Sequence, residues 1–412
     1  MIVKGSTAAV IVAVVVVVAA IALLVALPMM TAQSRGGLGV EEVRIGAIVP
    51  LTGPFVITGS NYPLGFQLAI DEINSKGGVL GAKLRLIVYD DKNDAKEAVA
   101  AFQRLVEVDR VVAVVGLDSS GIAAAVVPEA EKYKVPVFFQ FAGSPALLTK
   151  STRYAFRTCV PAAPMLVQAV AEFIQAKGIK SVASVVAAYE WGFYIKDAFE
   201  RFVRPMQGVI LQQEEAPLGE RDFTVYLRKL QPMNPELLSG VGHPPGIIML
   251  FKQAVEMGFN SKYFLGPYTP YQLYIDSMGE AAYNRVVAFS CIKFDSPEYI
   301  SVAQKFYQRY NKWMDIGAAT GYVTAYMIAN AIEKTRSTDP VKIADYIRSS
   351  RFEHPIFAWP LSYTEWGELK EATLYMVTLV KKSPPSGVNP GANWWIEVIY
   401  KSSPLTPYQP EK

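Results

Sequence analysis

Residues 43–54 read VRIGAIVPLTGP, a short apolar run that stops at a cluster of turn-forming residues. Such a run predicts a buried β-strand that ends near Pro50. The next segment, 63–76, carries apolar residues at helical spacing and stops at Gly77-Gly78, which predicts a helix closed by glycine. A strand followed by a helix is the repeating unit of an α/β fold.

The same alternation continues through the next hundred residues. Strands are expected at 84–89, 111–115 and 135–139, with helices between them at 94–108 and 122–133. Strands that alternate with helices in this way predict a parallel, doubly wound sheet that is covered on both faces.

The rhythm then begins again and predicts a second α/β lobe of similar build. Helices are expected at 163–177, 192–203, 223–230, 247–257, 297–314, 317–334 and 340–349. Strands are expected at 181–187, 209–213, 263–265, 286–289 and 394–400. No short-period repeat or low-complexity region interrupts the two lobes.

Composition excludes several classes of function. The 412 residues carry a net charge of only +3, from 40 basic and 37 acidic residues, so no basic footprint for nucleic acid is expected. Two cysteines and two isolated histidines leave little for a metal site. Motifs for phosphate binding, dinucleotide binding, zinc proteolysis or a nucleophile elbow are missing from the sequence. We therefore expect a protein that is not an enzyme and needs no cofactor.

The mean hydropathy of +0.20 has a local source. In residues 8–30 only Pro28 is not Ala, Val, Ile, Leu or Met. As a helix this run would reach ~34 Å, enough to cross a ~30 Å hydrocarbon core. We interpret 1–33 as a signal-type segment kept as a membrane anchor, with cleavage and secretion as the alternative, and 34–42 as a linker. The rest of the chain would then work outside the membrane.

Several segments, in this order and spacing, resemble the type I periplasmic binding proteins, most closely those serving branched-chain amino acid transporters of the ABC class. The matching segments are IGAIVPLTGPF (45–55), AIDEINSKGGVLG (69–81), VVAVVGLDSSG (111–121), FAGSPALL (141–148), GHPPGIIMLFKQAVEMGF (242–259) and FLGPY (264–268).

The resemblance implies two Rossmann-like lobes joined by three crossovers, with a ligand held in the cleft between them. By analogy the first lobe comprises 43–157 and 292–358, and the second comprises 159–290 and 360–402. The crossovers would fall near 157–160, 290–294 and 359–363, and 403–412 would be a proline-rich tail.

Loops of the first lobe supply most of the expected site. Asp118, Ser119 and Ser120 follow a strand and precede a helix, whose free backbone N–H groups favour an anion such as a carboxylate. The resemblance implies that Ser119 holds the carboxylate of an amino acid. It also assigns ligand contacts to the next loop and to the rim, which contribute Phe141, Ala142, Gly143, Ser144 and either Thr58 or Asn61.

The second lobe contributes Glu190, Trp191, His243 and Tyr268. Trp191 matches an aromatic residue that covers the ligand in relatives, and His243 would be a wall residue rather than a metal ligand. Tyr268 stands where relatives place a glutamate that pairs with the ligand's ammonium. Either Asp118 or Glu190 supplies the missing charge, or the ligand has no ammonium and is an aliphatic or aromatic carboxylate or an amide.

Cys159 and Cys291 fall in the first and second expected crossovers. Two readings remain open: separate buried thiols, or a disulfide across the hinge, which an extracellular compartment permits. A Cα–Cα separation beyond ~7 Å would exclude the disulfide.

The function expected from these features is that of a solute-binding protein of an ABC importer. It would capture a branched-chain or other hydrophobic amino acid and pass it to the permease subunits. The alternatives are the same role for an organic acid or an amide, and a sensory ligand-binding module that signals through a partner.

Overall fold

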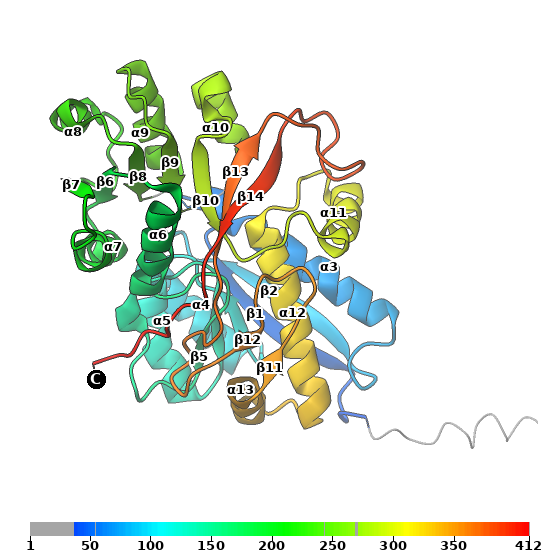
Figure 1. Cartoon of the computed structure of the whole chain (residues 1–412). Helices are drawn as coiled ribbons and strands as arrows, with labels where there is room; N and C mark the ends of the chain where they lie inside the picture. The colour runs from blue at the N-terminus through cyan, green and yellow to red at the C-terminus, as the bar shows by residue number, and fades with distance from the viewer. Residues whose placement is uncertain (1–36, 54, 243, 268–270, 412) are drawn as a thin grey trace, which may run out of the picture.

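The computed structural model describes residues 37–411 except 54, 243 and 268–270 (Figure 1). The expected anchor, His243 and Tyr268 therefore lie outside the described residues. Among the residues that are described, no helix is both long and apolar enough to cross a membrane.

The first sheet has five strands in the order β2-β1-β3-β4-β5, and all neighbouring strands run parallel. Its strands are β1 (Glu42–Val49), β2 (Lys83–Asp90), β3 (Val114–Gly116), β4 (Val137–Phe139) and β5 (Ala155–Arg157). This sheet confirms the parallel α/β arrangement expected for the first part of the chain.

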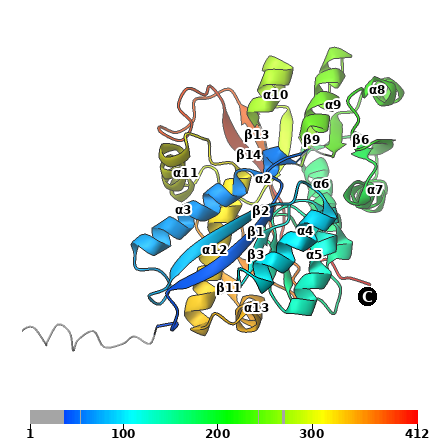
Figure 2. The same ribbon diagram turned by 180° about the vertical axis from the view of Figure 1, so that it is seen from behind.

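Helices cover both faces of the first sheet, because successive strand residues point to opposite faces. Ala47 packs in the same core cluster as Phe66, whereas its neighbour Ile48 packs in a second cluster with Phe102. Figure 2 shows α3 and α12 on one side of β1 and β2, and α4 and α5 on the other. The helices of this lobe are α2 (Val56–Gly59), α3 (Tyr62–Ser75), α4 (Ala95–Glu107), α5 (Ser120–Tyr133), α11 (Pro297–Tyr310), α12 (Ile316–Thr335) and α13 (Pro340–Ser349).

The second sheet has seven strands in the order β14-β13-β10-β9-β8-β6-β7. Its strands are β6 (Ser181–Ala187), β7 (Ile210–Ala216), β8 (Leu237–Val241), β9 (Tyr263–Gly266), β10 (Val286–Ser290), β13 (Tyr375–Val380) and β14 (Trp395–Lys401). Its helices are α6 (Ala163–Lys177), α7 (Glu190–Phe202), α8 (Thr224–Leu230), α9 (Pro244–Glu256) and α10 (Tyr271–Met278). The strands from β6 to β10 are parallel, but β13 and β14 are antiparallel additions at one edge.

Three strands of these two sheets, β5, β8 and β13, are not expected from the sequence, and neither are the helices α2 and α10. Strand β5 has only three residues, and β8 reads LLSGV, in which serine and glycine interrupt the apolar run. Strand β8 forms because it is buried between β6 and β9, and β5 forms because it pairs with β4 at the edge of the first sheet; both are tertiary effects that local sequence does not carry.

Helix α11 ends four residues before the expected boundary at Met314. Its C-cap Asn311 adopts the left-handed conformation, with φ of 50°, and donates its N–H to the carbonyl of Tyr307. Asparagine tolerates this conformation and commonly ends helices in this way. The expected strand at 111–115 is likewise displaced, since pairing begins only at Val114.

The chain passes between the two sheets beside the disulfide. It leaves the first sheet after β5 and enters α6, and it leaves the second sheet after β10 and enters α11. Cys159 and Cys291 lie in these two passages and form a disulfide, with a Cα–Cα distance of 5.4 Å. Of the two readings of the cysteines, the hinge disulfide is confirmed. A third passage contains β12 (Leu361–Ser362), which pairs antiparallel with β11 (Arg351–Phe352).

The proline-rich tail is packed against the body of the protein. Leu405 is buried and donates its N–H to Ala372, and the carbonyl of Tyr408 accepts a hydrogen bond from the indole of Trp366 at 3.2 Å. Both ribbon views place the C-terminus near α5 of the first lobe. The tail thus packs on the segment that follows β12, and the N–H of Tyr408 also contacts Met165 Sδ of α6 at 3.3 Å.

A polar cluster ties α3 to α12 at the far side of the first lobe. Both oxygens of Glu72 are used: Oε2 accepts hydrogen bonds from Tyr322 and Tyr326 at 2.6 and 2.8 Å, and Oε1 accepts one from Lys305 at 2.7 Å. The ring of His354 packs against both tyrosines. Burial lowers the pKa of His354 to about 4, although Glu72 opposes this shift.

Candidate ligand-binding cleft

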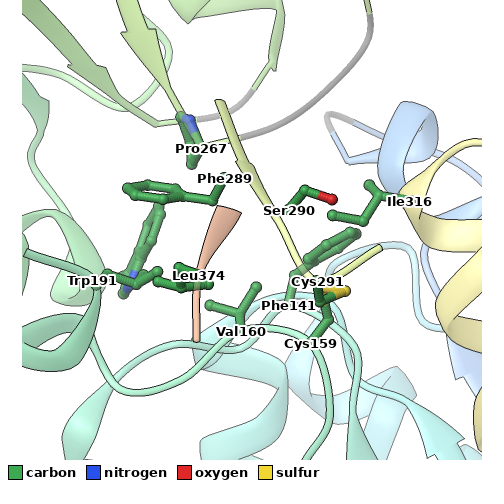
Figure 3. Close-up of a pocket in the computed structure, with 11 residues that line it drawn as sticks. Phe141, Cys159, Val160, Trp191, Pro267, Phe289, Ser290, Cys291, Ile316 and Leu374 are labelled. Atoms are coloured by element: carbon green, nitrogen blue, oxygen red, sulfur yellow. A yellow bond between two sulfur atoms is a disulfide. The ribbon is translucent and has the colours of Figure 1, made fainter. Parts of the chain in front are cut away.

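An apolar pocket lies between the two lobes, beside the disulfide (Figure 3). Trp191 and Phe289 stand on one side of it, and Phe141 and Ile316 stand on the other. The pocket is lined by Phe141, Cys159, Val160, Leu166, Trp191, Pro267, Phe289, Ser290, Cys291, Ile316 and Leu374. Because both lobes and both disulfide-bonded passages contribute to it, this pocket would change shape if the lobes moved.

A second, more polar pocket adjoins the first, since Phe141 and Ile316 line both. Its polar walls come from α2, the residue before α3 and the start of α12 in the first lobe, and from α10 in the second lobe. The lining comprises Ile57, Thr58, Asn61, Phe141, Tyr271, Gln272, Leu273, Trp313, Asp315, Ile316 and Gly317. Together the two pockets make one cleft with an apolar and a polar end.

The loop after β4 brings three of the expected residues together. The hydroxyl of Ser144 donates to Glu190 Oε1 at 2.7 Å, and its backbone N–H donates to the Ser120 hydroxyl at 3.1 Å. Ser120 and Ser144 belong to the first lobe, whereas Glu190 opens α7 of the second. In this structure the two lobes are thus joined directly through side chains that were expected to contact a ligand.

All three backbone carbonyls of Ala142–Ser144 accept hydrogen bonds from the protein. The guanidinium of Arg157 donates to Ala142 O at 2.5 Å and to Ser144 O at 2.7 Å, and the N–H of Ala163 donates to Gly143 O at 2.9 Å. The resemblance implied that carbonyls of this loop meet a ligand's ammonium. In this structure the three carbonyls of the loop already accept hydrogen bonds from protein donors.

Arg157 is the residue of this region that sequence reasoning missed. Its side chain is fully buried and pairs with Glu368, with 2.7 Å between Nε and Oε2. The sequence does contain a signal for this residue. An arginine at the end of the apolar stretch around β5 needs a counter-charge when it is buried. Its partner is 211 residues away and could not be named from the sequence.

Trp191 packs against the loop at Gly143. A Cβ atom on Gly143 would lie 2.6 Å from Trp191 Nε1, so only glycine leaves room for the indole in this position. Trp191 itself is buried. The structure thus brings Phe141, Gly143 and Trp191 together at the apolar end of the cleft.

Ser119 caps α5. Its hydroxyl accepts a hydrogen bond from the N–H of Ile122 at 3.4 Å and donates one to Asn93 Oδ1 at 2.9 Å. The cap leaves the backbone N–H groups at the start of the helix as the donors suited to an anion.

Asp118 is buried behind Thr58. The Thr58 hydroxyl, at the wall of the polar pocket, donates to Asp118 Oδ2 at 2.7 Å. Burial raises the pKa of Asp118 to about 7; the hydrogen bond from Thr58 opposes this shift, and the nearby Asp91 adds to it. Asp118 therefore changes charge near neutral pH.

A second carboxyl, Asp315, lies in the polar pocket itself. It caps α12 by accepting from Ala318 N at 2.8 Å and also accepts from Asn61 Nδ2 at 2.8 Å. Burial raises its pKa, which these hydrogen bonds oppose. Three acceptor oxygens near it are buried without a hydrogen-bond donor: Asn61 Oδ1, Asp118 Oδ1 and Gln140 Oε1.

No group of three or more His, Cys, Asp or Glu side chains that could hold a metal occurs among the residues with described positions. The two pockets are lined by apolar side chains together with hydroxyl, amide, indole and carboxyl groups.

The sequence profile of the periplasmic binding protein family matches residues 42–384. Among curated proteins, the chain is 26% identical over 335 residues to the leucine-, isoleucine-, valine-, threonine- and alanine-binding protein of Pseudomonas aeruginosa. That alignment covers 81% of this chain and 88% of the relative.

Solved structures share the fold. A branched-chain amino acid substrate-binding protein from Streptococcus pneumoniae, solved with isoleucine, gives a TM-score of 0.70 at 22% identity and covers 88% of this chain and 99% of its own. An R. palustris solute-binding protein, solved with 4-hydroxybenzoate, gives 0.75 at 18% identity and covers 89% and 98%. With the family profile spanning most of both lobes, the chain belongs to the periplasmic binding protein family, as a type I solute-binding protein of ABC transporters.

Proposed function

We propose that this chain captures a hydrophobic amino acid in the cleft between its lobes and delivers it to the permease of an ABC importer. The observation that carries the proposal is that an apolar pocket adjoins a polar pocket lined by the carboxyl group of Asp315, with the carboxyl group of Asp118 behind its wall residue Thr58. An amino acid with an apolar side chain needs both.

The apolar end suits a branched aliphatic or aromatic side chain. Phe141, Trp191, Phe289, Ile316 and Leu374 surround it, and burial of apolar surface is worth about 25 cal/mol per Å². Strongly polar side chains would lose their hydration here without finding charged partners.

The polar end suits an ammonium group. Asp315 lines it, Asp118 lies behind its wall residue Thr58, and Glu190 bonds to Ser144 in the loop whose Phe141 lines both pockets. The nearby cation Arg157 is already paired with Glu368. An ammonium also supplies the donors that the unpaired oxygens of Asn61, Asp118 and Gln140 lack. Glu190 or Asp118 would take the part that a glutamate plays in relatives at the position of Tyr268, and the N-terminus of α5 with Ser119 and Ser120 would hold the carboxylate.

A second candidate ligand is an aromatic carboxylic acid, in the same transport role. The rings of Phe141, Trp191 and Phe289 favour it, and the R. palustris structure was solved with such a compound. The carboxyl groups of Glu190 and Asp315 oppose it, because a second anion beside them would be repelled.

The working geometry follows from the same family. We propose that the first lobe comprises 43–157 with 292–358 and that the second comprises 159–290 with 360–402. The lobes would close about the three passages between them, near 157–160, 290–294 and 359–363. Residues 1–33 would hold the protein at the outer face of the membrane. The disulfide would keep the first two passages together during closure.

A thermal-shift screen tests the ligand class. Leucine, isoleucine, valine and phenylalanine are compared with three compounds that lack the ammonium: 4-hydroxybenzoate, 4-methylpentanoate and 4-methylpentanamide. A ligand at 100 times its dissociation constant stabilises the folded state by about 2.7 kcal/mol. We expect shifts with amino acids; shifts confined to the compounds without an ammonium would reject the amino acid and favour the second candidate.

A further inference from the structure

One side chain, that of Arg157, donates hydrogen bonds to two carbonyls of the loop at Ala142–Ser144. Arg157 ends β5, is fully buried, and directs its two terminal nitrogens at two carbonyls of this loop, Ala142 O at 2.5 Å and Ser144 O at 2.7 Å. A planar guanidinium fixes the spacing of two acceptors, which a lysine ammonium cannot do.

The counter-charge of Arg157 comes from the other end of the chain. Glu368 lies in a turn at 364–369 that follows the third passage between the lobes, and it is oriented by a hydrogen bond from the N–H of Leu369 at 3.1 Å. In the same turn, the carbonyl of Gly367 accepts a hydrogen bond from the backbone N–H of Arg157 at 3.2 Å.

Gly367 lets this turn approach β5 closely. It has φ of +87°, and a Cβ atom there would lie 1.9 Å from the carbonyl of Ala155. Strand β5 and the turn are therefore held together by backbone packing, a backbone hydrogen bond and an ion pair.

We propose that Arg157 is the positioning residue of the ligand-binding loop and that Glu368 makes the position of this loop depend on the third passage. The inference rests on the proposed function only in taking this loop as a ligand contact. Holding the two carbonyls fixes the direction of the Ser144 side chain, which reaches Glu190 across the cleft. Movement of the 364–369 turn would be passed through Glu368 and Arg157 to the loop.

The chain offers a matched control. Arg285 also donates to two carbonyls, Ser261 O at 3.0 Å and Phe259 O at 3.1 Å, and also lies over a phenylalanine ring. It precedes β10, at the opposite end of that strand from the cleft residues Phe289 and Ser290. Arg285→Lys therefore makes the same chemical change away from the loop.

The test compares Arg157→Lys with Arg285→Lys in the full chain. Amide hydrogen exchange in a peptide covering 139–148 reports the loop, and leucine titration reports binding. We expect Arg157→Lys to accelerate exchange in that peptide at least about tenfold, as loss of local stability allows, and to weaken leucine binding by a similar factor. Arg285→Lys should leave both unchanged.

Each outcome decides the matter. Unchanged exchange in the loop of Arg157→Lys overturns the inference, and so does equal acceleration in both variants, because that reports general loosening. If Arg157→Lys does not fold, the double variant Arg157→Gln with Glu368→Gln, which buries no lone charge, is measured against the same control. If the wild-type chain does not bind leucine, the proposed ligand class fails, while loop exchange still decides the role of Arg157.

Discussion

Ser144 and Glu190 meet across the cleft, with 2.7 Å between the hydroxyl of one and a carboxylate oxygen of the other. One belongs to the loop after β4 and the other to the start of α7, so this hydrogen bond connects the two lobes. If Glu190 serves as the partner of the ligand's ammonium, this contact marks the place where the ligand's charged end is received.

Replacing Glu190 with glutamine tests the charge and keeps the hydrogen-bond acceptor. We expect Glu190→Gln to weaken leucine binding about tenfold, equivalent to about 1.4 kcal/mol, with little change in melting temperature. Glu200→Gln is the control, because Glu200 lies on the same helix and pairs with Arg204. Equal affinities for wild type and Glu190→Gln, measured by calorimetry, would assign the ammonium to another group.

A methyl group on Gly143 should disturb the aromatic end of the cleft. The added Cβ would lie 2.6 Å from Trp191 Nε1, so the indole must move. We expect Gly143→Ala to weaken leucine binding at least about tenfold and to alter tryptophan emission. Gly219→Ala, in the turn after β7, places its Cβ where no atom lies within 4 Å, and it should do neither. Similar behaviour of the two variants would show that Trp191 does not shape the site.

The disulfide should stabilise the protein strongly because it closes a long loop. Cys159 and Cys291 are 132 residues apart, and in the chain-entropy view a loop of this size is worth about 5 kcal/mol. We expect the double variant Cys159→Ser with Cys291→Ser to lower the free energy of unfolding by about 2–5 kcal/mol, measured by denaturant titration. Two free thiols in the unfolded, unreduced wild-type chain would contradict the bond itself.

His354 should make the protein less stable in acid. Burial lowers its pKa to about 4 in the folded state, against about 6.5 when exposed. Between these values the unfolded chain binds a proton that the folded chain does not, so stability falls as pH falls from 6.5 to 4, by up to about 1.4 kcal/mol per pH unit.

The variant His354→Phe retains an aromatic ring beside Tyr322 and Tyr326 and removes this titration. Its stability relative to wild type should therefore rise as the pH is lowered from 7 to 4.5, as measured by urea unfolding. A constant difference between the two proteins over that range would show that His354 is not held neutral.

The sequence predicts the framework better than the contacts that shape the cleft. Elements with a clear apolar pattern, such as 163–177 and 181–187, form with the expected bounds. Strand β8 is not predicted from the sequence, because Ser239 and Gly240 interrupt its apolar run. These residues form a strand because they are buried between β6 and β9.

The same limit applies to the cleft. Local patterns and family resemblance point to the loops that carry Ser120, Ser144 and Trp191, which the structure places at the junction of the lobes. Contacts between residues that are far apart in the sequence could not be predicted in this way. The partnership of Arg157 with Glu368 depends on how the third passage folds back, and the cysteines leave two readings open until their separation is known.

The central claim, an amino acid held between the lobes by its apolar side chain and its ammonium, is tested most directly by titrating the chain with leucine and with 4-methylpentanoate in a calorimeter. The two compounds share the aliphatic chain and the carboxylate and differ in the ammonium alone. We expect one leucine bound per chain and at least about 100-fold weaker binding of 4-methylpentanoate, a difference of about 2.7 kcal/mol. Equal or tighter binding of 4-methylpentanoate would contradict this claim.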